Sequence, residues 1–317
     1  MTILSLYLIP ILLQSSSIED RFVRIEAASK GRVGAAVVTA TSSHFHRRDE
    51  RFSLQSVMKL MASMAALEQV DKKRWKLDQK FTFKRSDLSV SHQPILERLG
   101  NKASITISLA DLIELAVTES CSAAADFMIR KLGGPDKVND FLKSRKIQGM
   151  SVDRQERDLQ PEIAGLKWNP AYSDDAKFEA AAQRVSKADQ DAAWLRYQKD
   201  PRDTTTPAAM ADLLRKLVTG RLLSPKSTAY LLGVMERTST GPNRLKAGVP
   251  KGWRFGHKTG TSSTHKGVAW ATNDAGIARN TKGEWIIIVG LLKGSTLNPE
   301  GRDRIIRQVA EAAFLDQ

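Results

Sequence analysis

The sequence predicts a two-lobe α/β fold, in which an α/β lobe assembled from both ends of the chain carries an inserted all-helical lobe. Three observations indicate this arrangement. A β-branched apolar run lies near the beginning, the middle of the chain has helical periodicity, and apolar strands precede a final helix. Such elements bury their apolar faces by packing as layers. We therefore assign residues 17–54 and 221–317 to the α/β lobe and residues 55–220 to the helical lobe.

A predicted helix and a predicted strand come first. "IEDRFVRIEAASK" has the apolar spacing of a helix, and "GRVGAAVVTA" is apolar and β-branched, as core strands are. From Ser53 to about Gly220 the periodicity stays helical, and the run "AAADFMIRKLGG" ends in two glycines that stop a helix. Pro207 and Pro225 stand just inside two further helix starts.

The carboxyl end reads as three strands and a closing helix. The segments are "WRFGHKTG", "GVAWATNDAGIAR", "EWIIIVGLLKG" and the helix "RDRIIRQVAEAAFL". The turn "NTKG" joins the last two strands. Residues 164–200 interrupt the helical lobe, and their richness in alanine and charge predicts a solvent-facing helix or helical hairpin.

Residues 1–16 resemble a signal peptide. An apolar run from Ile3 to Leu13 precedes small polar residues, although a basic beginning is lacking. The run is too short to span a bilayer comfortably, so we expect export, to the periplasm, without a stable membrane anchor. The alternative is a flexible amphipathic amino-terminal end.

The composition narrows the class of protein. Lys and Arg number 49 against 35 Asp and Glu, but these charges are scattered, which does not favour a nucleic-acid partner. Cys121 is the only cysteine, so no intrachain disulfide can form. The histidines lack zinc-ligand spacing, and we expect no metal, no cofactor and a monomer. They are His44, His46, His92, His257 and His265.

Ser56 and Lys59 are the first candidates for chemistry. Their spacing of three places a hydroxyl and an amine on one helical face. A lysine whose pKa is lowered by burial and neighbouring positive charge can take the proton that makes a serine hydroxyl nucleophilic. The same spacing also arises by chance, so the pair needs support from other motifs.

Two further motifs supply that support. Lys258-Thr259-Gly260 lies on a predicted strand edge, which can pair with an extended acyl substrate, offer backbone N–H groups to an oxyanion and attract a carboxylate. The alternative is an ordinary edge strand with solvated polar residues. Ser120 and Ser122 end a predicted helix, and a second serine hydroxyl can relay a proton to a leaving nitrogen.

The order S-x-x-K, serine tripeptide, K-T-G resembles the penicillin-recognising serine enzymes, and in particular the class A serine β-lactamases. Residues 133–142, 202–217 and 271–277 are also similar to that family, and the resemblance runs from about residue 17 to 315. Asp126 and the distance from Lys258 to "ATNDAGI" are most similar to its extended-spectrum subgroup. The resemblance implies a five-stranded antiparallel sheet flanked by helices beside a helical lobe, with a small-molecule β-lactam as substrate.

The resemblance also implies a role for each matching residue. Ser56 would be the acylated nucleophile, Lys59 its proton acceptor and Ser120 the proton donor to the β-lactam nitrogen. Glu156 would activate the deacylating water, with Gln160 helping to hold it. Whether Lys59 or Glu156 is the base in acylation stays open.

The remaining roles concern the substrate and the loop that carries Glu156. Backbone N–H groups of Ser56 and Thr261 would form the oxyanion hole. Substrate-binding positions would be Ser122, Lys258, Thr259, Gly260, Thr261 and Arg244, the last either a carboxylate anchor or a surface arginine. Arg154 and Asp203 would form the ion pair that closes the neck of an enlarged Ω-loop, residues 154–203.

The chain departs from the family pattern in the serine tripeptide. Cys121 and Ser122 stand where the family has aspartate and asparagine. A serine hydroxyl is shorter than an amide and less able both to donate to a substrate carbonyl and to accept from the lysine. The loss of one such contact costs about 1–3 kcal/mol, so weaker activity or an altered substrate range is expected. We interpret Cys121 as a small buried filler.

The second departure lies inside the Ω-loop, where the chain is much longer than in the family. If the insert folds outward, Glu156 keeps its place; if the insert rearranges the loop, Glu162 becomes a rival. His92 replaces an aromatic residue at the site entrance. The leading hypothesis is a β-lactamase. The alternatives are a penicillin-binding carboxypeptidase or transpeptidase that deacylates slowly, and a non-catalytic β-lactam-binding module.

Overall fold

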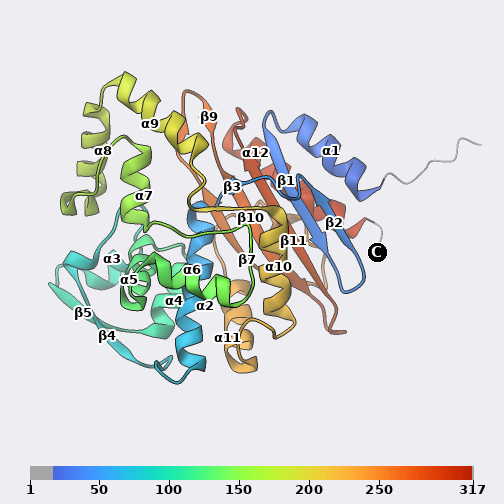
Figure 1. Ribbon diagram of the computed structural model, residues 1–317, viewed down its shortest axis with the longest axis horizontal. Coiled ribbons are helices and arrows are strands. Elements are labelled where there is room, and N and C mark those ends of the chain that lie inside the picture. Colours follow the sequence, from blue (N-terminus) through green and yellow to red (C-terminus); the bar gives the residue numbers. More distant parts are fainter. Residues whose placement is uncertain (1–16, 316–317) are drawn as a thin grey trace, which may run out of the picture.

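A computed structural model describes residues 17–315, so the predicted signal peptide lies outside the described part of the chain. Its centre is an antiparallel five-stranded sheet in the order β2-β1-β11-β10-β7 (Figure 1). The strands come from both ends of the sequence, as predicted. They are β1 (Arg32–Val38), β2 (Ser43–His46), β7 (Arg254–Thr261), β10 (Thr272–Arg279) and β11 (Trp285–Lys293).

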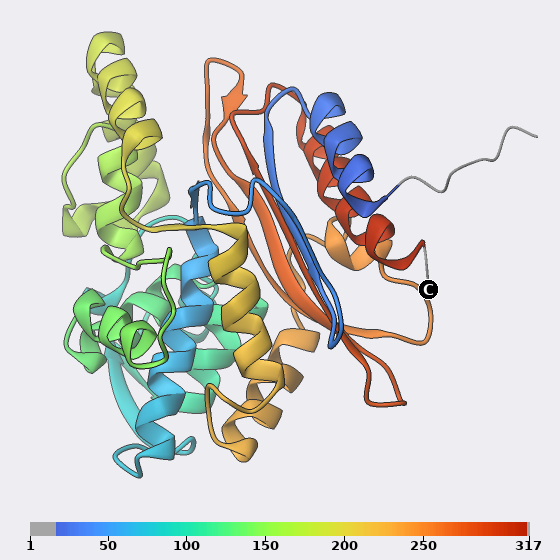
Figure 2. The same ribbon diagram turned by 45° about the vertical axis from the view of Figure 1, so that its right-hand side comes forward.

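Helices from the two ends of the described chain lie side by side on the outer face of the sheet (Figure 2). They are α1 (Ile18–Ala28) and α12 (Pro299–Phe314). Their apolar faces and the outward residues of β1 and β11 form one buried cluster that includes Phe22 and Ile306. This cluster makes the sheet a rigid support for the residues on its inner face.

The helical lobe covers the inner face. Helix α2 (Met58–Asp71) runs through its middle and is buried on all sides from Met58 to Glu68, so its apolar residues lie around the whole helix instead of along one face. Against it pack α4 (Leu109–Thr118), α5 (Ser122–Leu132) and α6 (Pro135–Ser144) of the same lobe, and α11 (Pro225–Glu236), which belongs to the segment assigned to the α/β lobe and also contacts β7. The helical lobe further contains α3 (Ile95–Leu99) and α10 (Pro207–Val218). Among these, α10 and α11 begin at the two prolines, as expected.

The helical lobe also contains strands that the periodicity reading missed. The ribbon of β4 (Lys80–Lys84) with β5 (Ser104–Ser108) is built from "KFTFK" and "SITIS", whose apolar and polar residues alternate with the period of a strand. A shorter pair, β3 (Phe52–Ser53) with β6 (Thr204–Thr205), joins the segment that leads into the Ser56 turn to the segment that leads into α10.

The insert is a helical hairpin of α8 (Asp175–Arg184) and α9 (Lys187–Lys199), which follows α7 (Glu156–Ile163) and protrudes beyond the helical lobe (Figures 1 and 2). It is not solvent-facing on every side, because Ala193, Trp194 and Tyr197 are buried. The single strand expected over "GVAWATNDAGIAR" is broken at Trp270, so that β9 (Val268–Ala269) pairs with β8 (Thr264–His265) in a separate hairpin.

Between residues 17 and 315, no helix combines the length and the apolar character that crossing a membrane requires.

Candidate active site

Ser56 lies on a 3-10 turn, Gln55–Val57, immediately before α2, and Lys59 lies in the first turn of that helix. The predicted shared face is therefore formed at a turn instead of within one helix. Lys59 Nζ donates a hydrogen bond to Ser56 Oγ over 2.7 Å. The S-x-x-K pair is thus brought together at the junction of the two lobes.

Lys59 is the hub of the cluster, with its side chain buried at 1% exposure. Its Nζ donates to the Ser120 carbonyl oxygen at 2.9 Å and to Ser122 Oγ at 3.2 Å, and it pairs with Glu156 Oε1 at 2.8 Å. The serine tripeptide reaches this position because Ser120 adopts a left-handed backbone, with φ 61°, just before α5 begins. Cys121 is fully buried, and burial raises the pKa of its thiol.

Glu156 begins α7 and points inward. Its Oε1 lies 3.2 Å from Ser56 Oγ, and its Oε2 accepts a hydrogen bond from Gln160 Nε2 over 2.9 Å. Burial alone would raise the pKa of this carboxyl, but the Lys59 ammonium and hydrogen bonds from Lys59, Gln160 and Ser56 outweigh burial and lower the pKa. Glu156 is therefore a carboxylate within reach of the serine oxygen.

Asp126 fixes the start of α7 from beneath. Its carboxylate accepts the backbone N–H groups of Glu156 at 2.8 Å and Arg157 at 3.0 Å, and the hydroxyl of Ser89. The first N–H groups of a helix have no partner within the helix, and a carboxylate suits the positive end of its dipole. Sequence analysis used Asp126 only as a mark of a subgroup and missed this contact.

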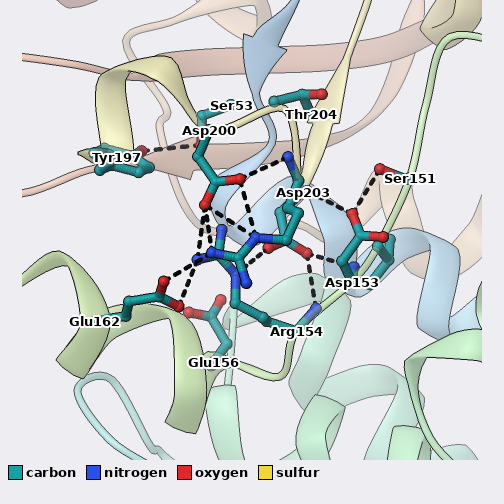
Figure 3. Close-up of polar contacts among 12 residues, drawn as sticks. Ser53, Ser151, Asp153, Arg154, Glu156, Glu162, Tyr197, Asp200, Asp203 and Thr204 are labelled. Atoms are coloured by element: carbon teal, nitrogen blue, oxygen red, sulfur yellow. Dashed lines mark hydrogen bonds and ion pairs between the residues drawn. The ribbon is translucent and has the colours of Figure 1, made fainter. Parts of the chain in front are cut away.

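The neck of the Ω-loop is closed by a buried arginine (Figure 3). Arg154 Nε lies 2.6 Å from Asp203 Oδ2, and its Nη1 contacts Glu162 at 2.7 Å and Asp200 at 3.1 Å. Glu162 also pairs with Arg202 over 2.7 Å. The carboxylate of Glu162 is thus part of the neck, whereas that of Glu156 faces Ser56.

Strand β7 brings the second lysine to the opposite side of Ser120. Lys258 Nζ donates to Ser120 Oγ at 2.9 Å and to the Thr259 carbonyl oxygen at 3.0 Å. Burial, followed by the charge of Lys59, lowers the pKa of Lys258 well below its usual range. Ser120 therefore lies between two amines, one from each lobe.

Gly260 lets the end of β7 approach the Ser56 turn. A Cβ at this position would fall 2.5 Å from the carbonyl oxygen of Leu54 and 3.2 Å from the nitrogen of Val57. No larger residue fits without moving one of the two lobes. Thr261 follows with an exposed side chain at the mouth of the site, and Thr259 Oγ1 lies 2.7 Å from Thr240 Oγ1.

Arg244 lies almost fully buried behind this strand end and is not an ordinary surface arginine. Its Nη2 donates to Thr261 Oγ1 at 2.9 Å, its Nη1 donates to the Asn273 carbonyl oxygen at 3.0 Å, and its Nε pairs with Asp303 at 2.8 Å. The guanidinium is thus held next to the predicted carboxylate site.

A pocket of about 530 Å³ opens over Ser56, which is the size of a typical small-molecule site. One wall comes from the insert and the facing wall from the β8–β9 hairpin. The insert and hairpin residues include Phe178, Ala182, Gln190, Trp194, Thr264 and His265. The two walls are connected, because Asp191 contacts His265 Nε2 at 2.7 Å and Lys266 Nζ at 2.6 Å. His92 lies at the entrance and its Nε2 is 2.7 Å from the Glu119 carbonyl oxygen.

Sequence analysis also missed contacts that connect these parts. Asn273 Nδ2 donates to the carbonyl oxygen of Ser53 over 2.7 Å, which joins β10 to the chain leading into the Ser56 turn. Gln55 accepts from Gln160 Nε2 at 2.9 Å and donates to Tyr197 of the insert. No short-range pattern signals these pairs, since their partners lie 100 or more positions apart. Within residues 17–315 no group of three or more His, Cys, Asp and Glu side chains could hold a metal ion.

The family model described as the beta-lactamase enzyme family matches residues 17–315. The chain is 33% identical over 268 residues to Beta-lactamase Toho-1 of Escherichia coli, an alignment covering 83% of this chain and 79% of that one. The chain belongs to the class A serine β-lactamases. Beta-lactamase VEB-1 of Pseudomonas aeruginosa is 28% identical over 306 residues, which are 95% of this chain and 90% of the relative.

Solved class A structures have the same fold. An ancestral (GNCA) class A β-lactamase superposes with a TM-score of 0.74 at 30% identity, covering 93% of this chain and 98% of its own. A putative class A β-lactamase, PenP of Rhodopseudomonas palustris, gives 0.74 at 31% identity, with 93% and 97% covered. The expected two-lobe serine β-lactamase fold is therefore confirmed, and the chain is a class A β-lactamase by sequence and by structure.

Proposed function

We propose that this class A β-lactamase hydrolyses β-lactams through an ester on Ser56. In acylation Ser56 Oγ attacks the lactam carbonyl carbon and the carbon–nitrogen bond breaks. Ser120 Oγ gives the nitrogen a proton and regains one from Lys59, whose Nζ lies 3.5 Å away. Backbone N–H groups of Ser56 and Thr261 stabilise the oxyanion. The Glu156 carboxylate, whose Oε1 lies 3.2 Å from Ser56 Oγ, can receive the proton of that hydroxyl directly. Lys59 Nζ lies 2.7 Å from the same oxygen and can receive the proton only as a neutral amine.

Substrate binding is assigned to the β7 side of the pocket. Lys258, Thr259 and Arg244 hold the substrate carboxylate, and the arrival of that anion favours the ammonium form of Lys258. Gly260 and Thr261 offer backbone to the substrate, and Ser122 offers its hydroxyl. Because Ser122 is shorter than the amide usual in the family, we expect weaker binding of substrates with an acylamino group.

Deacylation is assigned to Glu156. It takes a proton from water, the water oxygen attacks the ester carbonyl carbon, the bond from that carbon to Ser56 Oγ breaks, and Glu156 returns the proton to Ser56 Oγ. The observation that carries this proposal is the position of the Glu156 carboxylate, buried and 3.2 Å from Ser56 Oγ. A penicillin-binding transpeptidase has no such carboxylate and would keep its ester.

The test is turnover of a coloured cephalosporin, with mass spectrometry of the protein, for the wild type, Ser56→Ala and Glu156→Gln. We expect steady turnover by the wild type, no adduct on Ser56→Ala, and an accumulated adduct on Glu156→Gln. A long-lived adduct on the wild type would favour the transpeptidase alternative, and neither adduct nor turnover would leave a binding module. Rapid turnover by Glu156→Gln would refute the role of Glu156.

A further inference from the structure

The insert reaches the catalytic carboxylate through a short series of buried hydrogen bonds. Tyr197 lies on α9 with its side chain nearly inaccessible, and its hydroxyl contacts Gln55 and Ser53. Gln55 contacts Gln160, and Gln160 contacts Glu156. Gln55 immediately precedes Ser56, so both reactions at the site take place beside this series.

The negative charge of Glu156 determines which group donates in each hydrogen bond between Glu156 and Tyr197. The Glu156 carboxylate can only accept, so its partner must be the Nε2 group of Gln160. The same Nε2 group also contacts Gln55, which must therefore present its oxygen, Oε1. The Gln55 Nε2 group then points to the Tyr197 oxygen, which accepts that bond and donates its own hydrogen to Ser53 Oγ at 2.9 Å.

Tyr197 supplies a neutral hydroxyl at the far end of this series. Burial raises the pKa of its phenol to about 12, so the hydroxyl stays neutral at any working pH. Its ring is held against Trp194, with centroids 5.6 Å apart. The hydroxyl supplies the acceptor for the buried Gln55 Nε2 group, and without it that donor would lose this partner and the Gln55 amide would be held from the Gln160 side alone.

We propose that Tyr197 is a positioning residue of the insert, which fixes the Gln55 and Gln160 amides so that Gln160 always donates to Glu156. The inference rests on the proposed role of Glu156 in deacylation. If the Gln55 amide turns over, its Nε2 faces Gln160, and the Gln160 oxygen is then turned toward the Glu156 carboxylate. Loss of a donated hydrogen bond raises the pKa of a carboxylate and removes an orienting contact.

Tyr197→Phe is the direct test, because it removes one oxygen atom and keeps the ring against Trp194. Tyr172→Phe is the matched control, since it makes the same change just before α8, outside the series. In single-turnover experiments with a chromogenic cephalosporin we expect Tyr197→Phe to slow deacylation about tenfold or more, and to leave acylation within about threefold. The acid limb of the deacylation pH profile should move to higher pH.

A double-mutant cycle separates amide orientation from general loosening. Gln55→Met removes the amide at similar volume, so in that background Tyr197→Phe should have little further effect on deacylation. Full additivity of the two changes, an unmoved pH profile, or equal slowing of acylation and deacylation would each overturn the inference. If Glu156→Gln accumulates the ester while Tyr197→Phe behaves like Tyr172→Phe, only this inference fails. If Glu156→Gln deacylates rapidly, the proposed function fails first.

Discussion

Asp126 shows how one buried carboxylate can serve the site without touching the substrate. It lies fully buried beneath the first turn of α7 and accepts hydrogen bonds from the backbone N–H groups of Glu156 and Arg157. Burial is the main cause that raises its pKa to about 6, and the nearby Glu156 charge adds to the increase. The Asp126 carboxyl therefore gains or loses its proton near pH 6.

The stability of the protein should report this titration. Because the folded-state pKa of Asp126 lies above its unfolded value, the folded protein holds the proton more tightly, and the free energy of unfolding falls as pH rises from about 4 to about 6. The contribution lost is on the order of 3 kcal/mol, given a folded-state pKa of about 6 against an ordinary 3.8.

We expect Asp126→Asn to lack that part of the pH dependence, as measured by urea unfolding at pH 4.5 and pH 7. Comparing the two pH values within each protein removes any constant effect of the substitution. The assignment would be contradicted if the unfolding free energy of the wild type and that of Asp126→Asn changed equally between pH 4.5 and pH 7.

At the scale of elements, the insert forms a wall of the substrate pocket. Helix α8 contributes Phe178 and Ala182, and α9 contributes Gln190 and Trp194. The contact of Asp191 with the β8–β9 hairpin holds this wall opposite Ser56. Such a wall limits the size of the acyl substituent that the pocket accepts.

Ala182→Phe should narrow the pocket from the α8 side. We expect kcat/KM to fall about tenfold or more for a penicillin with a phenylacetyl side chain, since extra volume in a filled pocket discriminates by size. The kcat/KM for the penicillin nucleus with a free amino group should change little. Ala188→Phe is the control, because Ala188 is exposed on α9. Equal losses for the two substrates would show that α8 does not select by size.

At the scale of the whole molecule, the site depends on how closely the sheet approaches the helical lobe. Gly260 and Asn273, on neighbouring strands, contact the backbone of residues 53–57. Ser56 and Lys59 lie on one side of this contact and Lys258 on the other. A small separation of the lobes would therefore misplace the nucleophile relative to the lysine and the oxyanion site.

Gly260→Ala should separate the lobes locally, because its Cβ would fall 2.5 Å from the Leu54 carbonyl oxygen. We expect acylation to slow by about 100-fold, the usual consequence of a misplacement of about 1 Å. Gly233→Ala is the control: it lies in α11, and the nearest atom to its Cβ would be 3.7 Å away. In a helix this change should be neutral or stabilise by up to about 1 kcal/mol. Acylation by Gly260→Ala at the wild-type rate would contradict this account.

Much of this architecture could be predicted from the chain, because some signals are local. The spacing of Ser56 and Lys59 and the K-T-G triplet predicted residues that the fold brings together, and the prolines at 207 and 225 marked helix starts. The broken strand at Trp270 could not be foreseen, since its apolar pattern continues through the break. The roles of Asp126, Gln55 and Tyr197 depend on contacts made only when distant segments fold together.

The arginine at the neck of the Ω-loop has a consequence for chain entropy. Arg154 and Asp203 hold the two ends of the loop, so the segment between them behaves as a closed ring. The entropic cost of closing a flexible ring grows only with the logarithm of its length, by about 0.6 kcal/mol for each doubling. A change in the number of residues between these two positions therefore alters the entropic cost of closing the loop only slightly. As long as the Arg154–Asp203 pair is kept, residues can be inserted next to the nucleophile with little loss of stability.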